Sequence, residues 1–233
     1  MLKFEKNHYT IEEVTLCGET VRFRAFRDLV YVEKPVNAEF QKMMQSIKGA
    51  KISTAGFTDK TTKNNLDLVK WCENAYKNGW GYVYGGYGQI CTEQYLDQQA
   101  SLFPGNNEAG GEMRTVGEKW LGKRVVDCIG LIKSYAWYNA DSGEIVAGSN
   151  GFTDCGANSI WNNVKEGGAI STMPDIPGLA VWMDGHIGVY VGNGEVIEAQ
   201  GTAYGVVKTQ LKNRGWTKWM KIPNIKYVEV KSK

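Results

Sequence analysis

Between Asn65 and about residue 166, apolar residues recur at helical spacing in several segments, which predicts a series of helices there. From Asn65 to the stop signal Asn78-Gly79, the apolar positions that repeat in this way are Leu66, Val69, Cys72, Ala75 and Tyr76. Further helices are predicted over residues 92–103, about 112–121, and 157–166. Another opens at Asp127 and is amphipathic, with one apolar side formed by Cys128, Leu131, Ile132, Tyr135 and Ala136.

Alternating apolar and polar residues predict antiparallel strands near both ends of the chain. Residues 9–16 and 21–26 flank a turn at Cys17-Gly18-Glu19 and predict a β-hairpin. After Pro177, strands are predicted over residues 178–183, 186–191, 195–200 and 216–222. Helices followed by strands indicate an α+β fold, in which the helices pack on an antiparallel β-sheet. We expect an N-terminal extension over residues 1–63 (the hairpin and a linker), a main domain over 64–225 and a tail over 226–233.

Composition and charge narrow the classes of function. Hydrophobic residues make up 42% of the chain, enough to bury a core, and a net charge of +2 does not call for a nucleic-acid partner. The first 20 residues contain no long apolar run, so we expect no classical signal peptide and no membrane insertion. The protein would then be cytoplasmic as synthesised. A basic C-terminal face is expected to be solvated; it comprises Lys208, Lys212, Arg214, Lys218 and Lys221.

Cysteine and histidine are scarce, which limits the candidates for catalysis. The five cysteines lack any CxxC pair, so neither a disulfide framework nor a zinc site is expected, and no cofactor is implied. Cys128 follows Asp127, a good N-cap residue, and would lie in the first helical turn, where the thiol pKa can be lowered. The alternative is a small core residue on an apolar face. His186 is the only histidine in the region of helices and strands, so it is the candidate base for Cys128.

The hairpin register decides whether a third polar residue faces His186. A three-residue loop would pair Val191 with Glu195, which places Glu198 and Gln200 on the face of His186. A two-residue turn would move Glu198 to the far face. In the first register Glu198 could accept the imidazole N–H and fix the tautomer. Otherwise it is a solvated strand carboxylate.

Five short motifs, taken in order, resemble the NlpC/P60 family of papain-like cysteine peptidases and amidases. They are Tyr82-Val83-Tyr84-Gly85-Gly86, Asp127-Cys128-x-Gly130, the segment 177–181, the segment 186–194, and Val196-Ile197-Glu198-Ala199. The similarity covers roughly residues 66–222. It implies a papain-like fold and hydrolysis of amide bonds in the stem peptides of bacterial peptidoglycan, typically next to γ-D-glutamate and a diamino acid. Such an enzyme would act on the wall after release or secretion.

The resemblance also implies roles for individual residues. Cys128 matches the nucleophile, His186 the base, and Glu198 the variable third position. Tyr82 matches a tyrosine beside the nucleophile, so we expect it to assist at the oxyanion or substrate site. Asp127 and Gln200 are further candidates for contacts with substrate.

Two departures from the family pattern bear on specificity. Ile129 replaces the usual serine, so Asp127 could remain a cap rather than bind a substrate amine. An insertion at about 87–123 lengthens the connection to Cys128, and we expect it to wall or cover the cleft. Two alternatives stay open: a papain-like amidase, deamidase or acyltransferase with another substrate, and a non-catalytic cell-wall-binding module.

Overall fold

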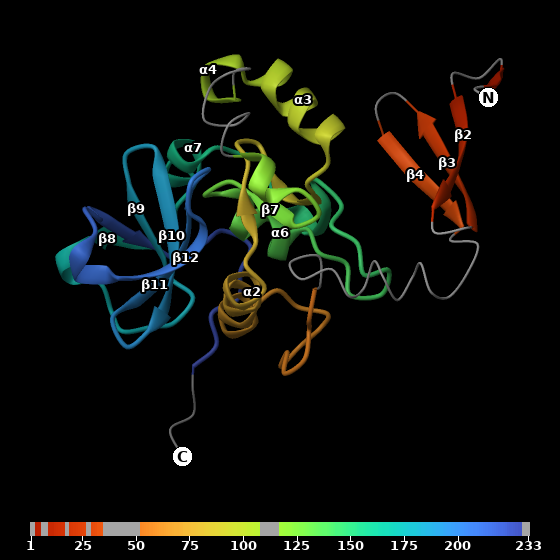
Figure 1. Cartoon of the computed structure of the whole chain (residues 1–233). Helices are drawn as coiled ribbons and strands as arrows, with labels where there is room; N and C mark the ends of the chain where they lie inside the picture. Colours follow the sequence, from red (N-terminus) through yellow and green to blue (C-terminus); the bar gives the residue numbers. More distant parts are fainter. Residues whose placement is uncertain are drawn as a thin grey trace. The chain divides into compact units, whose positions relative to one another are not determined.

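The computed structural model describes residues 3–5, 9–16, 19–26, 29–34, 52–107 and 117–229, with only the backbone described in the first four ranges. The chain separates into two compact units, Met1–Ile47 and Lys48–Lys233 (Figure 1). Each unit is considered by itself.

The N-terminal unit is an antiparallel sheet of four described strands in the order β1-β2-β3-β4. The strands are β1 (Lys3–Glu5), β2 (Tyr9–Leu16), β3 (Glu19–Phe26) and β4 (Leu29–Lys34). The predicted hairpin is present as β2 and β3, and Cys17 and Gly18 of its turn lie outside the described residues. The prediction of a hairpin alone was incomplete. A two-stranded hairpin has little stability by itself, and β4 supplies a further β-branched and aromatic segment that can pair with it.

The C-terminal unit confirms the predicted α+β class. Its main sheet has the order β12-β11-β10-β9-β13-β8 with antiparallel pairing throughout. The strands are β8 (Gly167–Ala169), β9 (Ala180–Met183), β10 (His186–Gly192), β11 (Glu195–Gly201), β12 (Gly205–Gln210) and β13 (Lys218–Met220). A smaller sheet has the order β5-β7-β6, formed by β5 (Gly81–Tyr82), β6 (Tyr87–Ile90) and β7 (Arg124–Val126). Strands β8 and β12 were not predicted.

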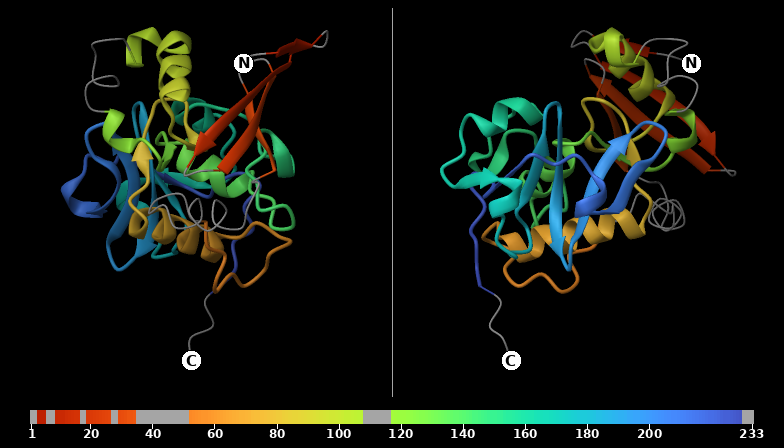
Figure 2. Two further views of the ribbon diagram at one scale, coloured as in Figure 1. Left: turned by 45° about the vertical axis from the view of Figure 1, so that its right-hand side comes forward. Right: turned by 90° about the vertical axis from the view of Figure 1, so that its left-hand side faces the viewer.

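Helix α2 (Asn65–Lys77) lies against strands β10, β11 and β12 (Figures 1 and 2). The side chain of Asn64 accepts a hydrogen bond from the Asp67 N–H and caps the helix, as the position before a helix favours. The buried side of α2 includes Leu68, Trp71 and Cys72. These residues join the main core together with Ile187 and Val189 of β10. The helix is present as predicted, but its buried side differs from the predicted one: Cys72 and Ala75 are buried, Leu66 and Val69 are half-buried, and Tyr76 is exposed.

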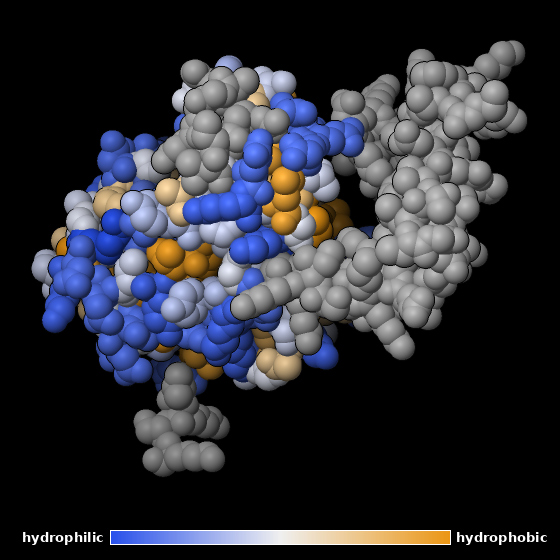
Figure 3. Space-filling view, viewed as in Figure 1, coloured by the Kyte–Doolittle hydropathy of each residue, from blue (hydrophilic) through white to orange (hydrophobic). Residues whose placement is uncertain are grey.

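The opposite face of the sheet is covered by a second apolar cluster. It contains Leu179, Val181, Tyr190, Val196, Trp216 and Trp219. Alternate side chains of β10 therefore point to opposite faces of the sheet. Ile187 and Val189 point toward the helices, and Tyr190 points toward the tryptophans. The face of the molecule in Figure 3 is mainly hydrophilic among the described residues, with small apolar patches.

Three of the helices predicted inside or after the insertion can be compared with the structure. Helix α3 (Glu93–Leu102), capped by Thr92, agrees with the prediction over residues 92–103 and is followed by α4 (Pro104–Asn107). Of the helix expected over about 112–121, the described part contains only a single 3-10 turn, η1 (Gly117–Trp120), so that prediction was wrong there. Helix α7 (Ala157–Trp161) is shorter than the predicted 157–166. Among the described helices, none has the length and apolar character needed to cross a bilayer.

Candidate active site

Strand β7 leads directly into the turn that carries Cys128. The Asp127 carboxylate accepts hydrogen bonds from the Gly130 N–H at 2.6 Å and from the Gly85 N–H at 2.9 Å. The Leu131 N–H bonds to the Asp127 carbonyl at 3.1 Å, which is the first helical hydrogen bond of α6 (Gly130–Ala136). Asp127 therefore caps the turn that leads into α6, but the helix itself begins at Gly130, so Cys128 lies in the turn before the helix and not in the predicted first helical turn. Because both Asp127 oxygens hold backbone groups, its geometry favours the cap role over a contact with substrate.

Gly130 allows the turn that carries Cys128 to lie close to the turn that follows Tyr82. A Cβ atom at this position would lie 1.8 Å from the Gly86 carbonyl oxygen, which itself accepts a hydrogen bond from the Asp127 N–H at 2.8 Å. Strand β5 pairs in parallel with β7, so that Tyr82 is opposite Val126. The turn after Tyr82 is thus fixed against the turn that carries the thiol, and only glycine fits at the contact.

The tip of the β10–β11 hairpin is a two-residue turn. Gly192 pairs with Glu195, which leaves Asn193 and Gly194 as the turn. Their φ angles are 54° and 72°, the positive values that a type I′ turn needs. Of the two turns that the sequence left open, the two-residue turn is therefore the one present at the tip.

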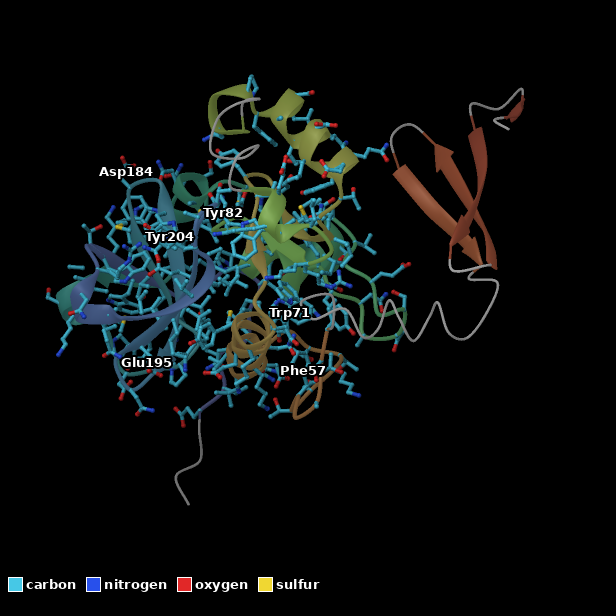
Figure 4. All side chains as sticks on the ribbon, in the orientation of Figure 1. Phe57, Trp71, Tyr82, Asp184, Glu195 and Tyr204 are labelled. Carbon is cyan, nitrogen blue, oxygen red and sulfur yellow. The ribbon has the colours of Figure 1, made fainter. Side chains whose placement is uncertain are left out.

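A β-bulge at Val191 restores the register that the site needs. Beyond the bulge the strands pair as the three-residue loop would have paired them, with Val189 opposite Ile197. Glu198 consequently shares the face of His186. Figure 4 labels Asp184, in the turn before β10, and Glu195, the first residue of β11.

His186 and Glu198 form a hydrogen-bonded dyad. The distance from His186 Nε2 to Glu198 Oε2 is 2.7 Å, and the Glu198 side chain has 0% exposure. Burial raises the pKa of Glu198, but hydrogen bonds from His186, Arg214 and Thr209 outweigh it and hold that pKa below its ordinary value. An ionised carboxylate has no proton to donate, so Nε2 carries the hydrogen. Nδ1 then remains as the basic nitrogen of the ring.

Arg214 and Thr209 complete the shell around the carboxylate. Arg214 donates to Glu198 through Nε at 2.9 Å and through Nη2 at 2.8 Å, and Thr209 Oγ1 donates at 2.7 Å. The prediction that Arg214 belongs to a solvated face was therefore wrong. It follows the 3-10 turn η4 (Leu211–Asn213), where the chain turns back over the end of the sheet. The bidentate geometry is the arrangement that arginine favours with a carboxylate.

Trp216 holds the imidazole ring in place from one side. The two ring centroids are 5.5 Å apart and the planes are inclined by only 12°. The space for this stack comes from Gly188, where a Cβ would lie 3.2 Å from Glu198 Cβ and 3.3 Å from Trp216 Cη2. Trp216 is 5% exposed, so the stack also limits the access of water to the dyad.

The Cys128 thiol lies beside the backbone that carries His186. Its Sγ is 4.0 Å from the carbonyl oxygen of Gly185, and the Ile187 N–H is close enough to favour the thiolate. Burial nevertheless raises the pKa of Cys128 to about 12, and the charge of Asp127 adds to this effect. The lowered pKa expected at a helix start is not observed. The thiol is therefore protonated at neutral pH and needs a base before it can act as a nucleophile, and its described contact is with Gly185, the residue before His186.

The turn before His186 is anchored by α7. Asn158 Oδ1 accepts from the Gly185 N–H at 2.7 Å, and its Nδ2 donates to Asp184 Oδ1 at 2.9 Å. This clamp holds the backbone next to the thiol. Sequence reasoning missed Asn158, because a polar residue in a short helix carries no signal for a contact with a distant turn.

The predicted site residues fall into two groups. His186 binds Glu198, the Cys128 sulfur lies against Gly185, the residue before His186, and Tyr82 lies beside the strand that leads to Cys128. Gln200 is half-buried near the end of β11, and none of the described contacts joins it to the dyad. The described residues contain no group of three or more His, Cys, Asp or Glu side chains that could hold a metal ion.

Comparison with known proteins agrees with this geometry. The family model described as NlpC/P60 matches residues 108–224, half of the chain. The chain belongs to the NlpC/P60 family. Members of this family are typically cell-wall hydrolases, and the papain-like α+β fold fits the sheet and helices described above.

A comparison with solved structures matched a smaller share of the chain, and a comparison with curated proteins found no match. A solved structure of the peptidoglycan hydrolase RipB from Mycobacterium tuberculosis is similar, with 20% sequence identity and a TM-score of 0.30. The match covers 47% of this chain and 50% of that chain, so this chain spans about half the length of that structure.

The buried carboxylate gives a prediction for stability against pH. Because the pKa of Glu198 is lower in the folded protein than in the unfolded chain, its stabilising contribution is present above its ordinary value and is lost as the pH falls below it. Unfolding in urea at about pH 7 and about pH 3.5 should show a smaller loss of stability for Glu198→Gln than for the native protein. Equal losses would show that Glu198 ionisation is not linked to folding.

Proposed function

We propose that this chain is a cysteine endopeptidase that hydrolyses amide bonds in peptidoglycan stem peptides, of the type between γ-D-glutamate and a diamino acid. The observation that carries the proposal is the placement of the Cys128 sulfur against the backbone on either side of His186, whose ring is oriented by the buried Glu198. The substrate class follows from membership of the NlpC/P60 family.

The proposed first half-reaction forms a thioester. His186 Nδ1 takes the thiol proton as Cys128 Sγ bonds to the amide carbonyl carbon. The carbonyl oxygen becomes an oxyanion, which the backbone N–H of Cys128 would stabilise with help from the Tyr82 hydroxyl. Collapse of this intermediate breaks the C–N bond, and the imidazolium returns its proton to the leaving nitrogen, which departs as an amine.

In the second half-reaction, water is the nucleophile and the cysteine sulfur is the leaving group. Nδ1 takes a proton from a water molecule as its oxygen attacks the thioester carbon. The C–S bond then breaks, the carboxylic acid leaves, and the sulfur regains the proton from the imidazolium. Glu198 keeps Nε2–H as the donor throughout, so the same nitrogen serves both halves.

Digestion of purified peptidoglycan tests the proposal directly. We expect new amine termini on stem-peptide fragments, identified by mass spectrometry, without new reducing sugar ends. Release of ammonia would instead support a deamidase, and transfer of an acyl group to an added amine would support an acyltransferase. Intact muropeptides at high enzyme concentration would contradict any lytic role.

Alkylation of the thiols distinguishes a catalytic cysteine from a cysteine in a non-catalytic binding module. We expect iodoacetamide to modify Cys128 faster than the buried Cys91, and the rate at Cys128 to fall at least tenfold in His186→Gln, because burial alone leaves the thiol protonated. Cys155, which is half-buried and outside the site, should label at the same rate in both proteins. Peptide mapping by mass spectrometry gives each rate. Slow labelling of Cys128 that ignores His186→Gln would favour the non-catalytic binding module.

A further inference from the structure

Glu198 binds two cationic groups through one carboxylate. Arg214 Nε and Thr209 Oγ1 donate to Oε1, while Arg214 Nη2 and His186 Nε2 both donate to Oε2. Because the last two nitrogens share one oxygen, they lie within about 6 Å of each other, a range over which one charge strongly affects another group. The exposed fractions of the Arg214 and His186 side chains are 24% and 15%, so water screens this interaction only in part.

A carboxylate that binds an imidazole orients it and stabilises the imidazolium, but a buried carboxylate without any other cationic partner can stabilise that form too strongly. A buried negative charge next to imidazole favours the imidazolium, which has no free lone pair to accept the thiol proton. Arg214 supplies a permanent positive charge on the far side of the same carboxylate. The pair Glu198–Arg214 then offers His186 a hydrogen-bond acceptor with little net charge.

We infer that Arg214 is a positioning residue that neutralises Glu198, so that this carboxylate orients His186 without strongly favouring the imidazolium form, which could not accept the Cys128 proton. The inference deepens the proposed function and rests on it for its catalytic consequence. It also explains why a glutamate can serve at this position without holding the base permanently protonated.

The other ionisable groups next to His186 do not duplicate this charge. Cys128, from the turn before α6, is a neutral thiol at neutral pH because burial raises its pKa to about 12. Asp127, behind it, is buried and binds two backbone N–H groups. Asp184, in the turn before β10, is exposed and hydrogen-bonded by Asn158. Each is neutral or negative, so Arg214 is the cation that the described contacts place on the dyad.

The titration of His186 can be followed by NMR, because the chain contains only two histidines, His8 and His186. The full chain is used with Cys128→Ala to remove the thiol and His8→Gln to leave one imidazole signal. In this background, Arg214→Met should raise the midpoint of the imidazole titration by about 1–2 pH units. Glu198→Gln, which leaves the arginine charge uncompensated, should lower it by a similar amount.

Two further variants separate charge from structure. The double variant Arg214→Met with Glu198→Gln again has no net charge at the two positions and should return the midpoint to within about half a unit of the native value. Lys212→Met removes an exposed charge two residues from Arg214 and should leave the midpoint unchanged. A role of Arg214 in folding alone does not predict opposite shifts that cancel.

The outcomes distinguish this inference from the proposed function, because the titration needs no peptidoglycan. A folded Arg214→Met protein with an unchanged midpoint overturns the inference, even if the native enzyme cleaves peptidoglycan. If Arg214→Met does not fold, an unchanged or raised midpoint in Glu198→Gln overturns it instead. The predicted shifts together with intact muropeptides would support the role of Arg214 and refute the substrate.

Discussion

Replacing Cys128 by alanine is expected to abolish the release of amine termini from peptidoglycan, with a loss of activity of roughly three orders of magnitude or more. The proposed thioester cannot form without the sulfur, and Asn158, Glu198 and Arg214 only position other groups. The fold should persist, because alanine replaces a side chain of similar shape that is 8% exposed in the core. Mass spectrometry of muropeptides measures the activity, and thermal unfolding monitors the fold.

The matched control is Cys155→Ala. Cys155 is a free, half-buried cysteine outside the candidate site, and its removal should leave cleavage within about twofold of the native rate. If a folded Cys128→Ala protein kept more than about a tenth of the native activity, Cys128 would not be the nucleophile.

Replacing Gly130 by alanine is expected to destabilise the protein by about 3 kcal/mol or more. The added Cβ would meet the Gly86 carbonyl oxygen at 1.8 Å, and that oxygen is fixed by the Asp127 N–H. A backbone atom cannot escape by changing rotamer, so the two turns must separate. For a domain of this size the melting temperature should fall by roughly 6–12 °C, as measured by calorimetry.

The control for this substitution is Gly105→Ala in helix α4. No atom lies within 4 Å of a Cβ built there, so the change should alter stability by less than about 0.5 kcal/mol. A Gly130→Ala protein that melts with the native temperature would show that the contact between the two turns yields easily. Its activity should then also be native, since the position of Cys128 would be unaffected.

The pKa of the Cys128 thiol differs from the one that the sequence predicted. A helix start was expected to lower the thiol pKa, but Cys128 is buried next to the negative Asp127, and both raise it. A short helix with its first N–H groups occupied by Asp127 has little to offset that cost. In the proposed mechanism, proton transfer to His186 is therefore the step that activates the sulfur, and the charge on Glu198 affects that step.

The sequence by itself determined the local features of this protein. Asp127 capping the turn of Cys128 and the presence of helix α2 depend only on neighbours within a few residues, and such short-range patterns can be recognised without tertiary information. Which side of α2 is buried was predicted only in part. The motif order also identified the NlpC/P60 family, which the match over residues 108–224 now shows.

Only the tertiary structure decided which distant groups converge on the dyad. The hairpin tip follows its local turn preference at Asn193-Gly194, and a bulge at Val191 restores the register, a compensation that no turn rule predicts. Arg214 and Trp216 reach the dyad because the chain folds back over the sheet, and in sequence they look like a surface charge and a core aromatic. Long-range contacts depend on how whole elements pack, which local spacing does not encode.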